Sequence, residues 1–146
     1  MGELEEFYER YIEKFNAGDR EAFAEFFHLP LTVVHAPRYD DRRAGRALAT
    51  VTELDQLLAP MPEHWVRSSI DALAAVDDAA PFDARSGLVE TGDRRPGLFA
   101  TVTRWHRDGE PYEHLHVLYL LTREQGRLGI KVMVELAAAR RARADA

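Results

Sequence analysis

At Leu31 the spacing of the apolar residues changes from that of a helix to that of a strand, and this change restricts the possible folds more than any other feature. Before it, apolar residues recur at the spacing of an amphipathic helix: Leu4, Phe7, Tyr8, Tyr11, Ile12 and Phe15. Gly18 is expected to end this helix, and Asp19 to cap a second helix that ends at Pro30. The buried face of the second helix would then be Ala22, Phe23, Phe26 and Phe27.

From Leu31 the period is two, which is typical of a strand with one buried face. Leu31, Val33 and His35 share that face. A charged loop follows at residues 38–46, and Thr52 with Asp55 three residues later predicts a short helix that reaches about Leu58. His35 therefore lies on an apolar face, where it points either into a pocket or into packed side chains.

The second half of the chain is expected to be strands: His64 to Ala74, Leu98 to His106, Glu113 to Thr122 and Leu128 to Glu135. Asp108-Gly109 is a strong hairpin signal, and Glu124-Gln125-Gly126 separates the last two strands, so these segments form an antiparallel meander. Residues 77–96 are expected to be an insertion or a long loop, with a short strand at Ser86 to Glu90 or a lid. Residues 138–146 are expected to be a flexible tail, the fraying end of a helix.

Helices followed by such a sheet make an α+β chain, and 146 residues are enough for one domain, residues 1–146. N-terminal helices packed in a curved antiparallel or mixed sheet would form a cone-shaped barrel. The formal net charge of -6 repels phosphate backbones, so we do not expect nucleic acid as a partner. With no cysteine, an acidic start and only short apolar runs, we expect a cytoplasmic protein with no membrane partner.

Three segments together resemble a known family: "FYERYIEKFNAGDREAFAEFF", the strand "LPLTVV" and the ending "HVLYLLTREQGRLGIKVMVEL". They are similar to the nuclear transport factor 2-like superfamily, particularly its SnoaL-like and ketosteroid-isomerase-like branches. The resemblance implies a cone that holds a ligand pocket, and a homodimer. The superfamily includes isomerases, dehydratases, polyketide cyclases, epoxide hydrolases and non-catalytic binding domains, so the resemblance implies a fold more directly than an activity.

Ketosteroid isomerase allows a comparison residue by residue. Its tyrosine five residues before a matching Asn-Ala-Gly-Asp corresponds to Tyr11, and its general-base aspartate falls on His35 when the strand is aligned through Thr32-Val33. The resemblance therefore implies that His35 faces into the cone. A carboxylate has become an imidazole here, and Glu113 to Thr122 contains no aspartate to match the protonated one in that enzyme's oxyanion hole.

These residues suggest acid–base chemistry. A neutral imidazole at His35 can accept a proton, while the phenol of Tyr11 can donate a hydrogen bond to a developing enolate. Other residues are expected to contact the substrate: Phe15, Phe27, Val33 and Tyr119 as apolar walls, and Tyr39 and Trp65 at the mouth.

No cofactor and no metal is expected. The sequence has no glycine-rich phosphate loop, no Gly-x-Ser-x-Gly elbow and no His-Glu-x-x-His helix. His114 and His116 share a strand face at a spacing that metal sites use, but two histidines supply too few ligands. If Leu115, Val117, Tyr119 and Leu121 face inward, both histidines face outward.

Two hypotheses remain open. The first is a cofactor-free isomerase, lyase or cyclase that acts on a hydrophobic carbonyl compound, with His35 as base and Tyr11 as hydrogen-bond donor. The second is a non-catalytic ligand-binding or dimerisation module, in which both side chains are core residues with one satisfied polar tip each. The missing carboxylate favours binding, whereas polar groups on otherwise apolar faces favour catalysis, because each costs free energy unless it is satisfied.

Overall fold

The computed structural model describes residues 2–35, 47–53, 65–76 and 96–140. Two helices come first, α1 (Glu3–Asn16) and α2 (Arg20–Ala24). The strands follow: β1 (Phe27–His35), β2 (Ala47–Val51), β3 (Trp65–Val76), β4 (Gly97–His106), β5 (Pro111–Glu124) and β6 (Arg127–Arg140). None of the helices in these ranges is long and apolar enough to span a bilayer.

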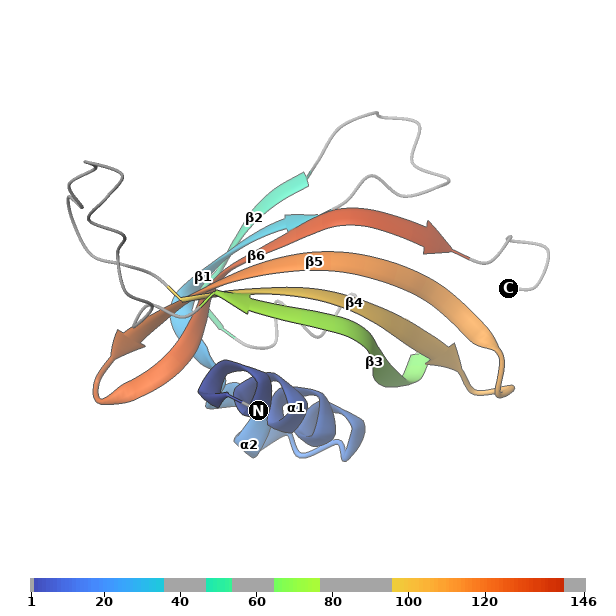
Figure 1. Cartoon of the computed structure of the whole chain (residues 1–146), viewed down its shortest axis with the longest axis horizontal. Helices are drawn as coiled ribbons and strands as arrows, with labels where there is room; N and C mark the ends of the chain where they lie inside the picture. Colours follow the sequence, from blue (N-terminus) through green and yellow to red (C-terminus); the bar gives the residue numbers. More distant parts are fainter. Residues whose placement is uncertain (1, 36–46, 54–64, 77–95, 141–146) are drawn as a thin grey trace, which may run out of the picture.

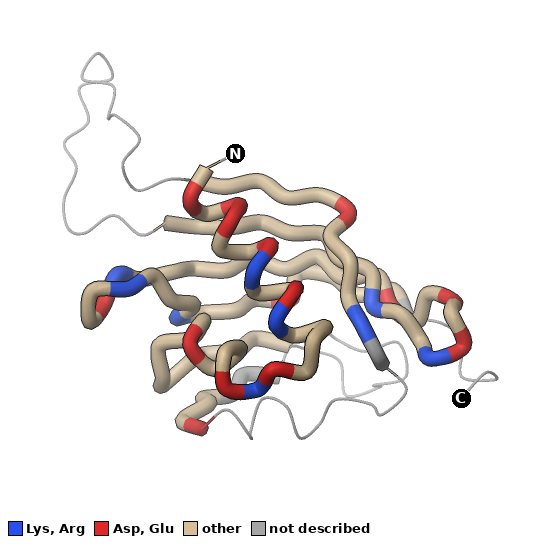
Figure 2. The backbone as a smooth tube through the Cα atoms, turned by 90° about the horizontal axis from the view of Figure 1, so that it is seen from below, with Lys and Arg blue, Asp and Glu red and all other residues tan. Residues whose placement is uncertain are grey.

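The described strands form one six-stranded sheet in the order β2-β1-β6-β5-β4-β3. β1 pairs with β6 in parallel, and every other neighbouring pair is antiparallel. The sheet curves over α1 and α2, which lie on its concave side (Figure 1), and Figure 2 shows α1 crossing the strands on that side. The prediction of an α+β cone with N-terminal helices in a curved mixed sheet is confirmed.

The helix signals in the sequence are confirmed where α1 ends and α2 begins. α1 buries Leu4, Phe7, Tyr8 and Tyr11 against the sheet. Gly18 has a φ of 69°, a left-handed conformation that glycine adopts without steric cost. The backbone N–H of Ala22 donates to the carboxylate of Asp19 at 3.1 Å, which is the expected cap of α2.

The predicted end of the second helix is wrong. α2 ends at Ala24, and Phe27 already belongs to β1 instead of the helix. Phe27 pairs with Ile130 of β6, and the Ile130 N–H donates to the Phe26 carbonyl at 2.8 Å, so a partner strand takes this segment from the helix. Pro30 lies inside β1, where the register with β6 shifts between Phe27 and Thr32, and a residue without an N–H is tolerated at such an irregularity.

The meander of β3 to β6 is confirmed, as are its turns. Gly109, with φ 89°, lies between β4 and β5, and Gln125 and Gly126, with φ 55° and 74°, lie between β5 and β6. The prediction of a helical end is wrong for residues 137–140. These residues belong to β6 and pair with β5 as far as Arg140. The predicted helix beyond Glu53, the loop at 38–46 and residues 77–95 and 141–146 lie outside the described part.

Alternate residues of the strands face the helices and build the core. Leu31 and Val33 on β1 are buried, as expected, and so are Leu115, Val117, Tyr119 and Leu121 on β5. Under α1 these side chains meet a group of aromatic rings. Farther along β1 and β6 the same concave face carries polar side chains instead, and these form the candidate site.

Candidate functional site

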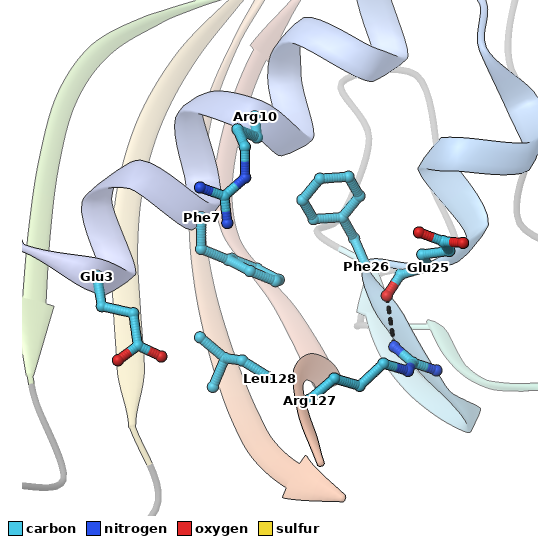
Figure 3. Close-up of a pocket in the computed structure, with 7 residues that line it drawn as sticks. All are labelled: Glu3, Phe7, Arg10, Glu25, Phe26, Arg127 and Leu128. Carbon is cyan, nitrogen blue, oxygen red and sulfur yellow. Dashed lines mark hydrogen bonds between the residues drawn. The ribbon is translucent and has the colours of Figure 1, made fainter. Parts of the chain in front are cut away.

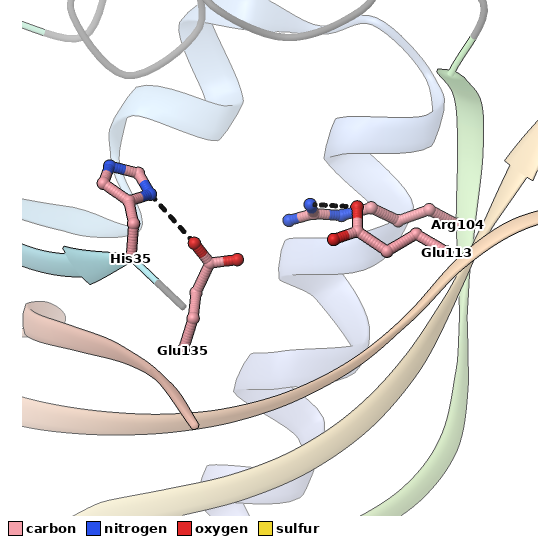
Figure 4. Close-up of polar contacts among 4 residues, drawn as sticks. All are labelled: His35, Arg104, Glu113 and Glu135. Atoms are coloured by element: carbon pink, nitrogen blue, oxygen red, sulfur yellow. Dashed lines mark hydrogen bonds and ion pairs between the residues drawn. The ribbon is translucent and has the colours of Figure 1, made fainter. Parts of the chain in front are cut away.

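His35 is the last residue of β1, and its side chain is paired with a carboxylate. The Nδ1 atom of His35 lies 2.8 Å from Oε1 of Glu135 on β6 (Figure 4). The Glu135 side chain is only 5% exposed, whereas that of His35 is 36% exposed. One end of the pair is therefore buried in the sheet, and the imidazole end is open.

The strand register explains the pair. β1 and β6 are parallel, with Val33 opposite Met133 and Val34 opposite Val134. His35 and Glu135 are the next residues along, so they lie side by side on the concave face. Their neighbours on the same face of the two strands, Val33 and Met133, are apolar and buried.

The chemistry of the two groups fixes where the imidazole proton lies. An ionised carboxylate only accepts hydrogen bonds, so the Nδ1–H of neutral His35 donates to Glu135. The other nitrogen, Nε2, then carries the lone pair and can accept a proton. The hydrogen bond to Glu135 also holds the imidazole ring in one orientation.

A second buried charge pair lies on the same face. Nη1 of Arg104, on β4, donates to Oε2 of Glu113, on β5, at 3.1 Å, and the two residues are directly opposite each other in the sheet. The Glu113 side chain is 1% exposed and that of Arg104 is 16% exposed, so this ion pair is largely shielded from water. Figure 4 shows the Arg104 guanidinium and the carboxylates of Glu113 and Glu135 directed toward the space between the two pairs.

Three tyrosines lie beside these charges under α1. The hydroxyls of Tyr8 and Tyr119 are 2.9 Å apart, and the ring of Tyr11 packs on both tyrosines, with centroids 5.3 and 6.0 Å away. Burial raises the pKa of all three phenols well above 10, and each is also close enough to Arg104 for its positive charge to lower the pKa by a smaller amount. They are therefore neutral hydrogen-bond donors near pH 7.

Tyr11 connects this group to the histidine pair. Burial raises the pKa of Tyr11 most, and the neighbouring Tyr119 raises it further. Smaller effects come from Arg104, which lowers this pKa, and from Glu135, which raises it. Both charged groups therefore lie within electrostatic range of the Tyr11 hydroxyl. Tyr11 on α1 and His35 on β1, the two predicted catalytic residues, therefore lie on the same, concave side of the sheet.

The residues predicted as substrate contacts have different surroundings. Phe27, Val33 and Tyr119 are buried in the core, and Phe27 packs edge-on to Tyr11 with centroids 5.8 Å apart. Phe15 is half-buried against Phe23, at a centroid distance of 5.4 Å. Trp65 begins β3, but its side chain lies outside the described part, as does the whole of Tyr39. Contact between a substrate and any of these six residues stays a prediction.

The two histidines of β5 face outward, as predicted. His114 and His116 are exposed, and their Nδ1 atoms lie 3.0 Å from the Thr103 hydroxyl and 3.1 Å from the Thr101 hydroxyl, respectively. Within the described residues, no group of three or more His, Cys, Asp or Glu side chains is arranged to hold a metal ion.

Sequence reasoning missed the partners of the predicted residues: Tyr8, Arg104, Glu113 and Glu135. Both Glu113 and Glu135 project from the concave face, so this face carries two carboxylates, although neither is at residue 35, where the comparison aligns the general-base aspartate. The alternation of buried and exposed residues along the strands could have revealed these two carboxylates. Glu135 is two residues after the buried Met133, and Glu113 is two residues before the buried Leu115, so each charge falls on a core face.

Solved structures share the fold of this chain. ActVI-ORFA from Streptomyces coelicolor has a TM-score of 0.56 at 17% sequence identity, over 90% of this chain and 92% of its own. Aln2 from another Streptomyces species has a TM-score of 0.52 at 19% identity, over 91% of this chain and 86% of its own. An NTF2-like protein of unknown function from Shewanella baltica has a TM-score of 0.49 at 12% identity, over 97% and 99% of the two chains.

No protein-family model matches the sequence, and no curated protein matches it at a significant level. At sequence identities below 20%, the likeness to the solved structures shows the fold alone.

Proposed function

From the nuclear transport factor 2-like fold, which the chain shares with these structures, we propose a cofactor-free acid–base enzyme that acts on a hydrophobic carbonyl compound. The observation that carries this proposal is the hydrogen bond of 2.8 Å between His35 and Glu135. It joins an imidazole that is 36% exposed to a buried carboxylate on the concave face of the sheet. Such a pair leaves Nε2 as a base that faces the substrate.

The reaction begins with proton transfer from carbon. Nε2 of His35 takes a proton from the carbon next to a carbonyl group, and the electron pair of that C–H bond forms a C=C bond while the carbonyl π pair moves to oxygen. The products of this step are an enolate and an imidazolium ion, whose charge Glu135 stabilises. If the substrate has a C=C bond between its β and γ carbons, the enolate is a dienolate, and return of the proton to the γ carbon moves the double bond into conjugation and completes an isomerisation without any second reactant.

Tyr11 and Arg104 act on the developing negative charge. The Tyr11 phenol stays neutral because burial raises its pKa, so it can donate a hydrogen bond to the enolate oxygen. Arg104, held in place by Glu113, adds a fixed positive charge on the same face. Attack of the enolate carbon on a second carbonyl, or loss of a group from the neighbouring carbon, would make the same site a cyclase or a lyase.

The test is hydrogen–deuterium exchange at a carbon acid. The protein is incubated with 2-tetralone, a small hydrophobic ketone, in deuterated buffer, and loss of the α-proton signal is followed by proton NMR. We expect His35→Ala to lower the rate above buffer by about a hundredfold or more, and Glu135→Gln by at least about tenfold. His114→Ala is the matched control, because this histidine lies on the outer face of the same sheet.

Two results would count against catalysis by His35. One is a His35→Ala protein that keeps the fold, judged by circular dichroism, and the wild-type rate. The other is a wild-type rate equal to that of buffer for 2-tetralone and for a panel of cyclic ketones and 1,3-diketones.

A non-catalytic ligand-binding module is the second candidate, and one observation favours it. The rings of Tyr8, Tyr11, Phe23, Phe27 and Tyr119 pack on one another under α1, which fills that end of the cone. A binding module would take up the ketone, seen as line broadening of its NMR signals, and release it with every proton retained.

A homodimer and a cytoplasmic location are part of the same proposal. The outer face of the sheet exposes large apolar side chains on three strands: Val76, Phe99 and Leu136. Burying them against a second copy would remove apolar area from water. We expect sedimentation to show a dimer that Phe99→Glu weakens and that Leu29→Glu, an exposed leucine on β1, does not; a monomeric wild type would contradict the proposal.

A further inference from the structure

A hollow lies away from the concave site, between α1, the connection from α2 to β1, and the start of β6 (Figure 3). Its volume is about 360 Å³, within the lower part of the range for small-molecule sites. Phe27 begins β1 beside this hollow and His35 ends the strand, so the two sites are separated by on the order of 20 Å. We refer to this hollow as the helix pocket.

The floor of the helix pocket is aromatic and aliphatic. It consists of Phe7 on α1, Phe26 just before β1 and Leu128 on β6. The two phenylalanine rings meet nearly edge to face, with centroids 5.1 Å apart and an interplanar angle of 67°. The remaining ring surface and the Leu128 side chain suit a flat aromatic body, which can add a further ring contact of the same kind.

The rim of the helix pocket is charged: Glu3, Arg10, Glu25 and Arg127 line it. Glu3 is neutralised by an ion pair of 2.7 Å with Arg123. Arg127 donates to the backbone carbonyls of Glu25 and Phe27, and these hydrogen bonds fix its position. No carboxylate among the described residues forms an ion pair with it.

Arg10 is the cation best placed for a ligand. It is exposed, and Figure 3 shows its guanidinium above Phe7, directed to the space between the helix and Leu128. In the described part of the chain it has no hydrogen bond and no ion pair with another side chain. Among the described residues of the rim, the two guanidinium groups of Arg10 and Arg127 outweigh the one carboxylate without an ion pair, that of Glu25. The rim therefore favours one negative charge in a protein whose net charge is -6.

We infer that the helix pocket binds a small aromatic carboxylate. Its ring lies on Phe7, Phe26 and Leu128, and its carboxylate accepts hydrogen bonds from Arg10. A guanidinium presents paired N–H groups that match the two oxygens of a carboxylate, so an acid is favoured over a neutral amide of the same shape. The volume accommodates one or two fused rings.

The test uses 2-naphthoate and its neutral isostere 2-naphthamide. Each is titrated into ¹⁵N-labelled full-length protein, and amide shifts in proton–nitrogen correlation spectra give both the location and the Kd. We expect the shifts to centre on Phe7, Arg10 and Leu128, and the acid to bind about fivefold or more tightly than the amide. Arg10→Gln should raise the Kd of 2-naphthoate by about the same factor and leave that of 2-naphthamide unchanged.

Arg107→Gln is the matched control, because it removes the same charge from an exposed residue in the turn between β4 and β5. It should leave both affinities unchanged. Equal losses for the two arginine variants would show a non-specific charge effect and overturn the inference. So would equal affinities for acid and amide, shifts centred on Val33, His35 and Glu135, or no saturable shift at millimolar ligand.

Discussion

At the scale of single residues, Gly129 and His28 illustrate how tightly β1 packs on β6. His28 is buried, and its Nε2 lies 3.0 Å from the Arg127 carbonyl oxygen. A Cβ atom at residue 129 would lie 2.7 Å from that Nε2 and 2.9 Å from the ring Cγ, closer than a real Cβ contact. A side chain at this position must therefore displace the imidazole.

We predict that Gly129→Ala lowers the free energy of unfolding by about 1–3 kcal/mol, because the displaced imidazole loses its hydrogen bond and its packing. Urea unfolding measures the change. Gly97→Ala is the control, since a Cβ there would meet its nearest atom, the Tyr119 carbonyl oxygen, at an ordinary 3.6 Å.

The double mutant Gly129→Ala/His28→Ala tests the cause. With the imidazole removed, adding the methyl group at residue 129 should cost much less than it does in the wild type. An undiminished cost would show that the damage comes from the strand backbone and not from His28.

At the scale of elements, the turn between β5 and β6 has a residue unsuited to its conformation. Gln125 and Gly126 have φ of 55° and 74°, and hairpin turns with two positive φ values favour Asn-Gly. We predict that Gln125→Asn raises the free energy of unfolding by about 0.5 kcal/mol, because asparagine tolerates a positive φ better than glutamine does.

Thermal and urea unfolding of Gln125→Asn and Gly126→Ala check this prediction together. The second variant places a Cβ at a left-handed position that needs glycine, so it should destabilise the protein. A Gln125→Asn protein no more stable than the wild type would show that this turn does not limit stability.

Elements whose signal is local could be predicted from the sequence. The strands of the meander are confirmed to within two residues, except at the end of β6, because alternation and turn residues mark their ends, as at Asp108-Gly109. The boundary between α2 and β1 could not be predicted, since Phe27 becomes a strand residue only through its pairing with Ile130. The same holds for residues 137–140, which β5 holds in the sheet.

The candidate site, too, could be predicted from the sequence only in part. His35 and Tyr11 could be placed on buried faces from their spacing, and the family resemblance directed both into the cone. Glu135 could not be assigned to His35, because the two are 100 positions apart and only the parallel pairing of β1 with β6 brings them together. The pairing of Arg104 with Glu113 likewise depends on the register of β4 and β5.

At the scale of the whole molecule, the buried tyrosines couple stability to alkaline pH. Burial raises the pKa of Tyr8, Tyr11 and Tyr119 well above the ordinary value of 10.0. Above about pH 10 the unfolded chain has lost these three protons while the folded protein still holds them. Because the unfolded state then binds fewer protons, the free energy of unfolding falls as the pH rises.

The number of buried phenols sets how steeply the free energy of unfolding falls with pH. Each contributes about 1.36 kcal/mol per pH unit once the pH is well above its unfolded pKa, so three contribute about 4 kcal/mol per unit, starting near pH 10. Stability from these residues is fully present below pH 10. A domain of ordinary stability would therefore unfold within about two to three pH units above that point.

Absorbance near 295 nm, which reports tyrosine ionisation, and far-ultraviolet circular dichroism measure this together. Of the five tyrosines, we expect these three to ionise only as the sheet signal is lost, whereas in concentrated urea all five titrate near pH 10. Tyr8→Phe should lower stability at neutral pH, because the Tyr119 hydroxyl loses its partner, and yet reduce the alkaline slope by about a third. Ionisation of all five tyrosines with the native dichroism intact would show that the phenols under α1 are open to solvent, and that the cone is wide enough there to admit a ligand.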